Sequence, residues 1–225
     1  MNEQMPRGPL SGKRALVTGA SGGVGMAIAR ALAGTGADLS LSAIGANALE
    51  QTAEEIKREF GVDVETHTAN LAHGVEADAL ALSCNDVNIL VSATGNLPHG
   101  RIEDISDDVW RKSWNAAVYA PINLIREMWQ NMHETTDGLI IIVIDSPNSP
   151  QAQDINASMA GGALMSLVEA LGVRESEDSP VRVLGLVSGR KGDGAAIAAA
   201  ISRISCDPEK FESGTLLSPD VVNAG

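Results

Sequence analysis

The sequence predicts one α/β domain in which a parallel sheet of about seven strands is doubly wound, with helices on both faces. Two observations carry this prediction. Strand-like and helix-like hydrophobic segments alternate along all 225 residues, as in repeated strand–helix–strand units joined by right-handed crossovers. The apolar run at 138–144 has no polar face, which is typical of a central parallel strand covered by helices on both sides.

The expected strands are short apolar runs bounded by turn residues: 14–18, 37–43, 63–69, 87–93, 138–145, 181–187 and 214–218. The expected helices have apolar residues at helical spacing: 23–34, 46–60, 74–84, 106–133, 156–172 and 193–204. Ser106, Asp107 and Asp108 mark a helix start, because short polar and acidic side chains satisfy the free N–H groups there. No repeat or linker divides the sequence, so we expect 1–225 to be a single domain with a loose lead-in at 1–12.

The composition narrows the range of partners. The formal net charge is −13, and such a surface repels nucleic acid and anionic membranes, so neither is expected as a partner. No apolar run is long enough to span a bilayer, and the first residues lack the apolar core of a secretory signal. Cys84 and Cys206 have no metal-ligand spacing. We expect reduced thiols, no metal site and a cytoplasmic location.

The strongest functional signal lies at the first predicted strand and helix. An apolar run at 15–17 suits a buried strand, Gly19, Gly23 and Gly25 follow it, and the periodic segment 23–34 begins at once. Glycines let the backbone approach a ligand, and the free N–H groups at a helix start face an anion. The arrangement predicts a turn that holds a pyrophosphate.

The spacing of this turn, with three residues between Gly19 and Gly23, resembles that of the short-chain dehydrogenase/reductase family. The resemblance covers nearly the whole chain and implies a Rossmann-type fold with NAD or NADP as cofactor. The residues that match the family's phosphate turn are Thr18, Gly19, Ser21, Gly22, Gly23, Val24 and Gly25. Asn70 falls where the family has an Asp that bonds the adenine amine, and Gly95 matches the glycine that follows the family's fourth strand.

The end of the second predicted strand departs from the family. There an acid binds the ribose hydroxyls of NAD, or a base binds the extra phosphate of NADP. Ala43 and Ile44 stand at these positions and carry neither charge, while Ser42 or Asn47 would supply only weaker hydrogen bonds. We therefore expect weak dinucleotide binding, with little preference between NAD and NADP.

The resemblance also implies four catalytic residues: an Asn, a Ser, a Tyr and a Lys that lowers the pKa of the Tyr. Asn115 fits the Asn, and the Ser position falls on Asp145 or Ser146. The Tyr and Lys positions fall on Ala157 and Gly161. Neither of these residues can carry a proton or a charge.

No other register supplies the missing pair. The single tyrosine is Tyr119, which we expect to pack, and Asn123 follows it four residues later. Asp145 is either a replacement acid or base or, as we prefer, a loop-start residue that caps nearby N–H groups. Only 36 residues follow Gly189, so the segment that covers the substrate in the family is expected to be missing here.

Three functions stay open. The first is a family member that keeps a nucleotide site without hydride transfer, a pseudoenzyme with a binding or regulatory role. The second is a non-redox isomerase, cyclase or lyase that uses Asp145, Ser146 or Asn115. The third is an NAD(P)-dependent oxidoreductase with an unusual proton donor, which the absent Tyr and Lys disfavour. Family members also pair two helices into a four-helix bundle, so we expect a homodimer or homotetramer through helices 106–133 and 156–172.

Overall fold

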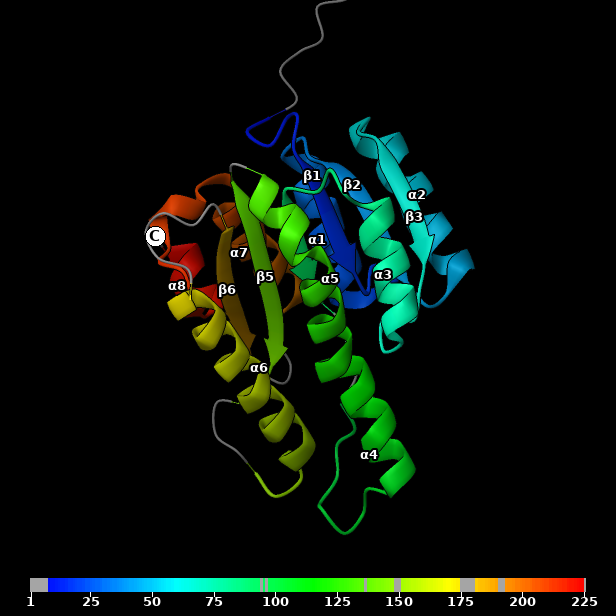
Figure 1. Cartoon of the computed structure of the whole chain (residues 1–225), viewed down its shortest axis with the longest axis vertical. Helices are drawn as coiled ribbons and strands as arrows, with labels where there is room; N and C mark the ends of the chain where they lie inside the picture. The colour runs from blue at the N-terminus through cyan, green and yellow to red at the C-terminus, as the bar shows by residue number, and fades with distance from the viewer. Residues whose placement is uncertain are drawn as a thin grey trace, which may run out of the picture.

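The sheet is built from seven parallel strands in the order β3-β2-β1-β4-β5-β6-β7 (Figure 1). The computed structural model describes residues 8–93, 95, 97–135, 137–147, 151–174, 181–189 and 193–224. The strands are β1 (Arg14–Thr18), β2 (Asp38–Ala43), β3 (Val64–Thr68), β4 (Ile89–Ser92), β5 (Gly138–Asp145), β6 (Val181–Ser188) and β7 (Leu216–Leu217). The doubly wound parallel sheet is confirmed, with strand ends shifted by at most two residues from the expected ones.

Helices cover both faces of this sheet. One face packs against α1 (Gly23–Gly34), α2 (Ala46–Phe60), α7 (Gly194–Cys206) and α8 (Pro219–Ala224). The other face packs against α3 (Gly74–Ser83), α5 (Ala120–Glu134) and α6 (Ile155–Arg174). Because the order reverses between β1 and β4, a crevice opens at the carboxyl ends of these two strands, where doubly wound folds bind ligands.

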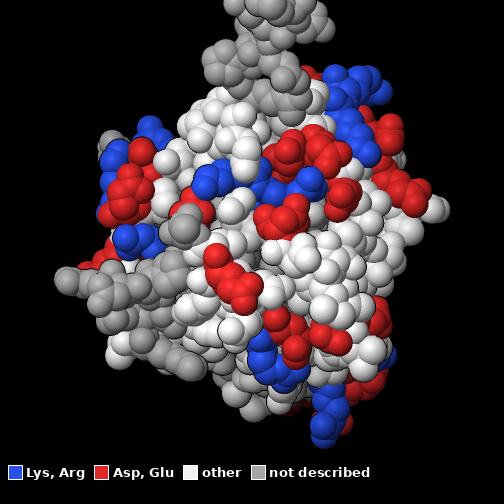
Figure 2. All heavy atoms as spheres, turned by 45° about the horizontal axis from the view of Figure 1, so that its top comes forward, with Lys and Arg blue, Asp and Glu red and all other residues white. Residues whose placement is uncertain are grey.

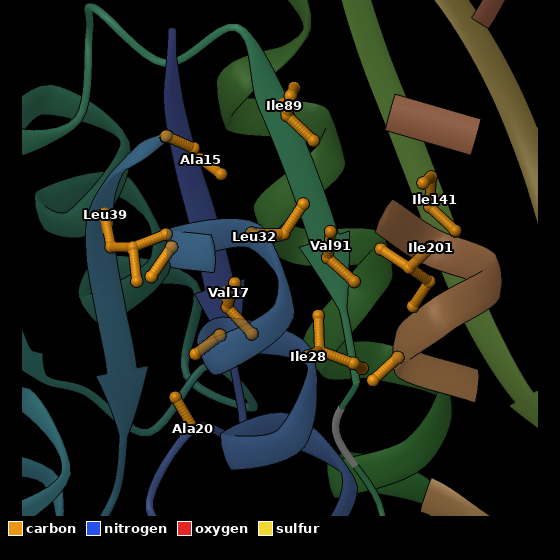
Figure 3. Packing of buried hydrophobic residues seen from close by; sticks show 14 of the residues in the cluster. Ala15, Val17, Ala20, Ile28, Leu32, Leu39, Ile89, Val91, Ile141 and Ile201 are labelled. Atoms are coloured by element: carbon orange, nitrogen blue, oxygen red, sulfur yellow. The ribbon is translucent and has the colours of Figure 1, made fainter. Parts of the chain in front are cut away.

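Between the sheet and the first group of helices lies an apolar core. Ile28 and Leu32 of α1 and Ile201 of α7 lie against β1 and β4, where Val17 and Val91 face them (Figure 3). All five side chains are fully buried. Burying a side chain of this kind contributes roughly 1.5–3 kcal/mol, so this packing fixes α1, and with it the glycine turn, on the sheet.

The long helix expected at 106–133 is not continuous. It consists of α4 (Asp107–Trp114), a π-helical turn η1 (Asn115–Tyr119) and α5, and Ser106 caps its start by accepting the N–H of Val109 at 3.5 Å. Pro121 has no N–H to donate to a carbonyl of the preceding turn, which favours a local change of helical register. The N–H of Ala120 bonds instead to the carbonyl of Asn115, five residues earlier.

Two segments near the ends of the chain complete the fold. Within the expected lead-in, Leu10 is buried and its N–H donates to the carbonyl of Thr35 at 3.0 Å. Near the other end, a short 3-10 turn η2 (Pro208–Lys210) and α8 were not expected. Each is too short to give a periodic signal, and α8 is held by the buried Val222.

Charges of both signs are interleaved on the surface toward the amino ends of the strands (Figure 2). The guanidinium of Arg14, for example, lies 2.9 Å from the carboxylate of Asp63 and 3.0 Å from that of Asp86. This view therefore presents no continuous basic surface over the described residues. Within the same part of the chain, no helix has both the length and the apolarity to cross a membrane.

Candidate nucleotide site

The turn between β1 and α1 borders a cavity of about 470 Å³ at the carboxyl ends of β1, β2 and β4. The residues expected to bind the cofactor that line it are Gly19, Ser21, Gly22, Val24, Gly25, Asn70 and Gly95. The structure thus brings together residues that lie far apart in the sequence. Thr18 and Gly23, also expected to bind the cofactor, are not among the lining residues.

Gly25 is required by the closeness of α1 to the turn. A Cβ on Gly25 would overlap the carbonyl oxygen of Gly19 and would lie 2.7 Å from its carbonyl carbon. The N-cap of α1 is Gly22, which offers no side-chain hydrogen bond to the first N–H groups of the helix. These N–H groups therefore stay open to an anion in the cavity.

Two residues hold the segment after β4 in place. Thr18 is fully buried, and its hydroxyl accepts the N–H of Ala93 at 3.2 Å. Gly95 has φ of +119°, and a Cβ there would lie 2.9 Å from the Cβ of Ala117. Thr18 thus supports the wall of the cavity, and glycine at 95 lets this wall approach η1.

Asn70 is fixed by its neighbours on the loop after β3. Its N–H donates to the carboxylate of Glu76 at 2.7 Å, and its side-chain oxygen accepts the N–H of Ala72 at 3.2 Å. The Asn70 N–H and, less strongly, His73 hold the pKa of Glu76 below its usual range. Glu76 therefore stays ionised at neutral pH. Because an amide oxygen has two lone pairs and the bond to Ala72 uses one, the Asn70 side-chain oxygen keeps the other for a ligand.

The end of β2 supplies an uncharged wall. Ile44 is 69% exposed at the rim. Ser42 is also a lining residue, but its hydroxyl is buried and has no hydrogen-bond partner among the described residues. None of the described residues that line this cavity carries a charge. From the sequence, Ser42 is only a weak candidate for the ribose end, because an unpartnered hydroxyl is a property of the packed structure.

A second, smaller cavity of about 200 Å³ adjoins the first, and both are lined by Val24, Ala93 and Gly95. It lies at the carboxyl ends of β5 and β6, beside α6. Asp145 is the one ionisable residue of its described lining, and its side chain is exposed. Asp145 therefore lies at the end of a strand and also borders the crevice. Its position fits both roles expected from the sequence, a loop-start residue and a replacement acid or base.

The other two candidate catalytic residues do not line this cavity. Asn115 is exposed within η1, and Ser146 is buried against α6. A Cβ on Gly161 would lie 2.7 Å from both the Cβ and the Oγ of Ser146, and Ala157 is fully buried. Both positions at which the resemblance predicts the Tyr and the Lys are thus closely packed. Tyr119, expected to pack, is 53% exposed.

One contact between the flanking loops was not foreseen. The Nδ1 atom of His99 lies 3.0 Å from the carboxylate of Asp154, a buried residue next to the start of α6, and the N–H of Gly100 donates to the carbonyl of Gln153 at 2.9 Å. These bonds join the loop after β4 to the loop before α6. Across the described residues, no three His, Cys, Asp or Glu side chains are grouped as a metal site would require.

The segment between β6 and α7 is short. It spans 189–193, and its residues 190–192 lie outside the described part of the chain. Asp193 caps α7 by accepting the N–H of Ala195 at 2.9 Å. The missing substrate cover expected from the sequence therefore stays a prediction.

Comparisons with known proteins agree with this architecture. Residues 13–190 match the family model described as short chain dehydrogenase. The chain is 32% identical over 180 residues to "Uncharacterized oxidoreductase YmfI" of Bacillus subtilis (strain 168), covering 79% of this chain and 74% of that protein. It is 30% identical over 217 residues to "Dehydrogenase/reductase SDR family member 4" of Homo sapiens, covering 92% and 74%. The crystal structure of a short chain dehydrogenase from Mycobacterium smegmatis has the same fold, with a TM-score of 0.85 at 22% identity and coverage of 94% and 93%.

Proposed function

The chain belongs to the short-chain dehydrogenase family, and from this premise we propose that it is a nucleotide-binding member without ordinary hydride transfer. Its role in this proposal is that of a binding or regulatory protein. The observation that carries the proposal is the contrast between the two cavities. The larger has open N–H groups for an anion, whereas beside the smaller one α6 itself is closely packed at Ala157 and at Gly161, which lies against Ser146, where the resemblance puts the family's proton donor and its lysine.

The properties of the larger cavity support an NAD or NADP site. Its volume of about 470 Å³ lies within the roughly 300–1,000 Å³ of ligand pockets. The N–H groups of α1 supply the donors that a pyrophosphate needs, since anions are stabilised at helix N-termini. The residues assigned to this site are Thr18, Gly19, Ser21, Gly22, Gly23, Val24, Gly25, Asn70 and Gly95.

The residues around the smaller cavity support the loss of hydride transfer. Ala157 and Gly161 offer no proton and no positive charge. The close contact between Gly161 and Ser146 leaves no room for the first carbon of a lysine side chain. In the family, a cofactor bound here supplies a hydride, while the residues of the protein must exchange the proton. No described residue that lines the smaller cavity does this in the way that the family does.

Asp145 favours a second candidate function. Its carboxylate is exposed in the smaller cavity, where it is placed to exchange a proton with a bound molecule. A non-redox isomerase, cyclase or lyase would use it as a general base. The same carboxylate is the proton donor that a redox reaction would need, and its substitution therefore tests both alternatives.

We expect NAD⁺ and NADP⁺ to bind weakly and within about threefold of each other, because neither an acid nor a base lines the ribose end. Titration calorimetry of both cofactors measures this. Ile44→Arg is expected to strengthen NADP⁺ binding selectively by about tenfold, since an Arg–phosphate contact is a charge-assisted bond and Ile44 is 69% exposed. A strong preference of the unmodified chain for either cofactor would contradict the proposal.

We also propose a homodimer or homotetramer through α4–α5 and α6. Part of the apolar surface expected there belongs to the core of the protomer, because Val118, Ile125 and Leu164 are buried. The support comes from Met159, which is 48% exposed, and from the half-buried residues Trp110, Trp114, Ile122 and Trp129.

Sedimentation at micromolar concentration is expected to show the oligomer, and Met159→Glu is expected to dissociate it, because a charge would be buried without a partner. The control is Val75→Glu, which adds the same charge to the exposed surface of α3. A monomer in every sample contradicts this arrangement.

We further propose that 1–225 act as one domain in the cytoplasm. The support is that the two cysteines are free, Cys84 buried and Cys206 half-buried, as is usual for proteins of a reducing compartment.

A further inference from the structure

We propose that the protein distinguishes the redox state of its nucleotide, binding NAD⁺ and NADP⁺ more tightly than NADH and NADPH. The carboxylate of Asp145, in the smaller cavity, is the group that selects the positively charged ring. This inference rests on the proposed nucleotide site at the turn before α1. It goes further by giving Asp145 a role in ligand selection, so that occupancy of the site follows the ratio of oxidised to reduced cofactor.

The two cavities adjoin, so that one dinucleotide can extend through both. Val24, Ala93 and Gly95 line the larger and the smaller cavity alike. In the proposed site the pyrophosphate lies at the start of α1 and the adenine lies toward Asn70, which lines the larger cavity. The nicotinamide end is therefore directed to the smaller cavity, whose volume of about 200 Å³ suits a single ring.

The alternation of side chains along β5 directs Asp145 toward the smaller cavity. Residues two apart in a strand point to the same face. Val143 lines the same cavity and packs against the layer that contains α1, whereas Ile144 is fully buried in the opposite layer. Asp145 follows the direction of Val143 and is exposed, so a molecule in the cavity can reach its carboxylate.

Asp145 supplies the one charge on the described lining of the two cavities. The oxidised nicotinamide ring is positively charged and the reduced ring is neutral, whereas the rest of the dinucleotide is the same in both forms. Only the oxidised ring is therefore attracted to the carboxylate by Coulomb forces. A carboxylate has two acceptor oxygens, so it can face this ring while it also accepts hydrogen bonds from the protein.

The net charge of the whole chain is a competing source of the same preference. NADH has one more negative charge than NAD⁺, and the formal net charge of −13 repels it more strongly. Distance separates the two effects, because charges farther apart than about 8 Å are largely screened at 0.15 M ionic strength, whereas a partly buried pair is screened much less. Because Asp145 is exposed, we expect the modest effect of a surface ion pair, about fivefold in affinity.

The test is titration calorimetry of the unmodified chain with NAD⁺, NADH, NADP⁺ and NADPH at neutral pH and about 0.15 M salt. We expect each oxidised cofactor to bind about fivefold more tightly than its reduced form. The ratio is expected to be the same for both pairs, because the charge that differs is on the ring. Equal binding of the two redox states, or tighter binding of the reduced ones, overturns the inference and leaves the proposed nucleotide site intact. If none of the four binds, the proposed function itself fails.

Substitutions at the two ends of β5 separate the carboxylate from the net charge. Asp145→Asn removes a negative charge beside the smaller cavity, and Asp137→Asn removes the same charge just before the other end of the strand, where Asp137 pairs with Lys13. We expect oxidised and reduced cofactors to bind Asp145→Asn within about twofold of each other, and Asp137→Asn and Asp145→Glu to keep a ratio of about fivefold.

Asp145→Ser, which is also uncharged, is the second variant and is expected to behave like Asp145→Asn. Urea unfolding selects the variants that are as stable as the parent for the comparison. A redox preference that survives in both uncharged variants, or that falls as much in Asp137→Asn, overturns the role of Asp145.

Discussion

The purified protein is expected to leave NADH and NADPH unoxidised in the presence of diverse ketones, aldehydes and quinones. The proton of that reaction must come from a group poised near neutral pH within hydrogen-bond reach of the substrate oxygen. In the proposed assignment, Ala157 and Gly161 take the places of the family's Tyr and Lys. Acid–base catalysis alone contributes roughly 10²–10⁴-fold to a rate, so the loss amounts to at least that factor.

Asp145 provides the sharpest check on this expectation. Its carboxylate is exposed in the smaller cavity, so it is the group that could replace the phenol. A turnover near ordinary enzyme values that disappears in Asp145→Asn would contradict the proposal and make Asp145 the proton donor. A turnover that survives Asp145→Asn would also contradict it and would point to a donor elsewhere in the chain.

Restoring the missing pair is not expected to restore the activity. The sequence alone suggests that Ala157→Tyr with Gly161→Lys would rebuild the site, but a Cβ at 161 would lie 2.7 Å from Ser146 and Ala157 is fully buried. We expect the double variant to lose about 1–3 kcal/mol or more of unfolding free energy, as overpacked cores do. Gly162→Lys is the control, because a Cβ at 162 meets no atom within 4 Å. Activity and full stability in the double variant would refute the packing argument.

Gly25→Ala is expected to destabilise the protein and to abolish nucleotide binding together. Helix propensity alone predicts the opposite sign, since Ala is favoured over Gly by about 1 kcal/mol within a helix. The new Cβ, however, would overlap the carbonyl oxygen of Gly19, so α1 must move away from the turn. We expect a loss of about 1–3 kcal/mol or more, measured by urea unfolding.

Gly162→Ala is the matched control for this substitution. It makes the same change inside α6, where the added Cβ meets no neighbouring atom, and it is expected to gain roughly 0.5–1 kcal/mol. Calorimetry with NAD⁺ then separates the two effects of Gly25→Ala. Wild-type stability and undiminished NAD⁺ binding in Gly25→Ala would mean that α1 does not pack on the turn as tightly as described.

The sequence by itself determined the sheet and the turn. The apolar run that became β5 and the alternation of strand and helix signals are local patterns, and a residue's own neighbours suffice to place it in a strand or a helix. The glycines at 19, 23 and 25 were equally informative. A tight turn before a helix depends on a few consecutive residues, so the position of this turn could be predicted before any tertiary contact was known.

Only the tertiary structure decided which side chains line the crevice and which are buried beside it. Asp145 and Ser146 are adjacent in sequence, yet one is exposed in the smaller cavity and the other is buried against Gly161, because alternate residues of a strand point in opposite directions and α6 packs on one of them. The unpartnered hydroxyl of Ser42 and the closed position at Ala157 likewise result from contacts between segments far apart in the chain. Hydrophobic periodicity identifies the element to which a side chain belongs, but close packing between elements determines what that side chain touches.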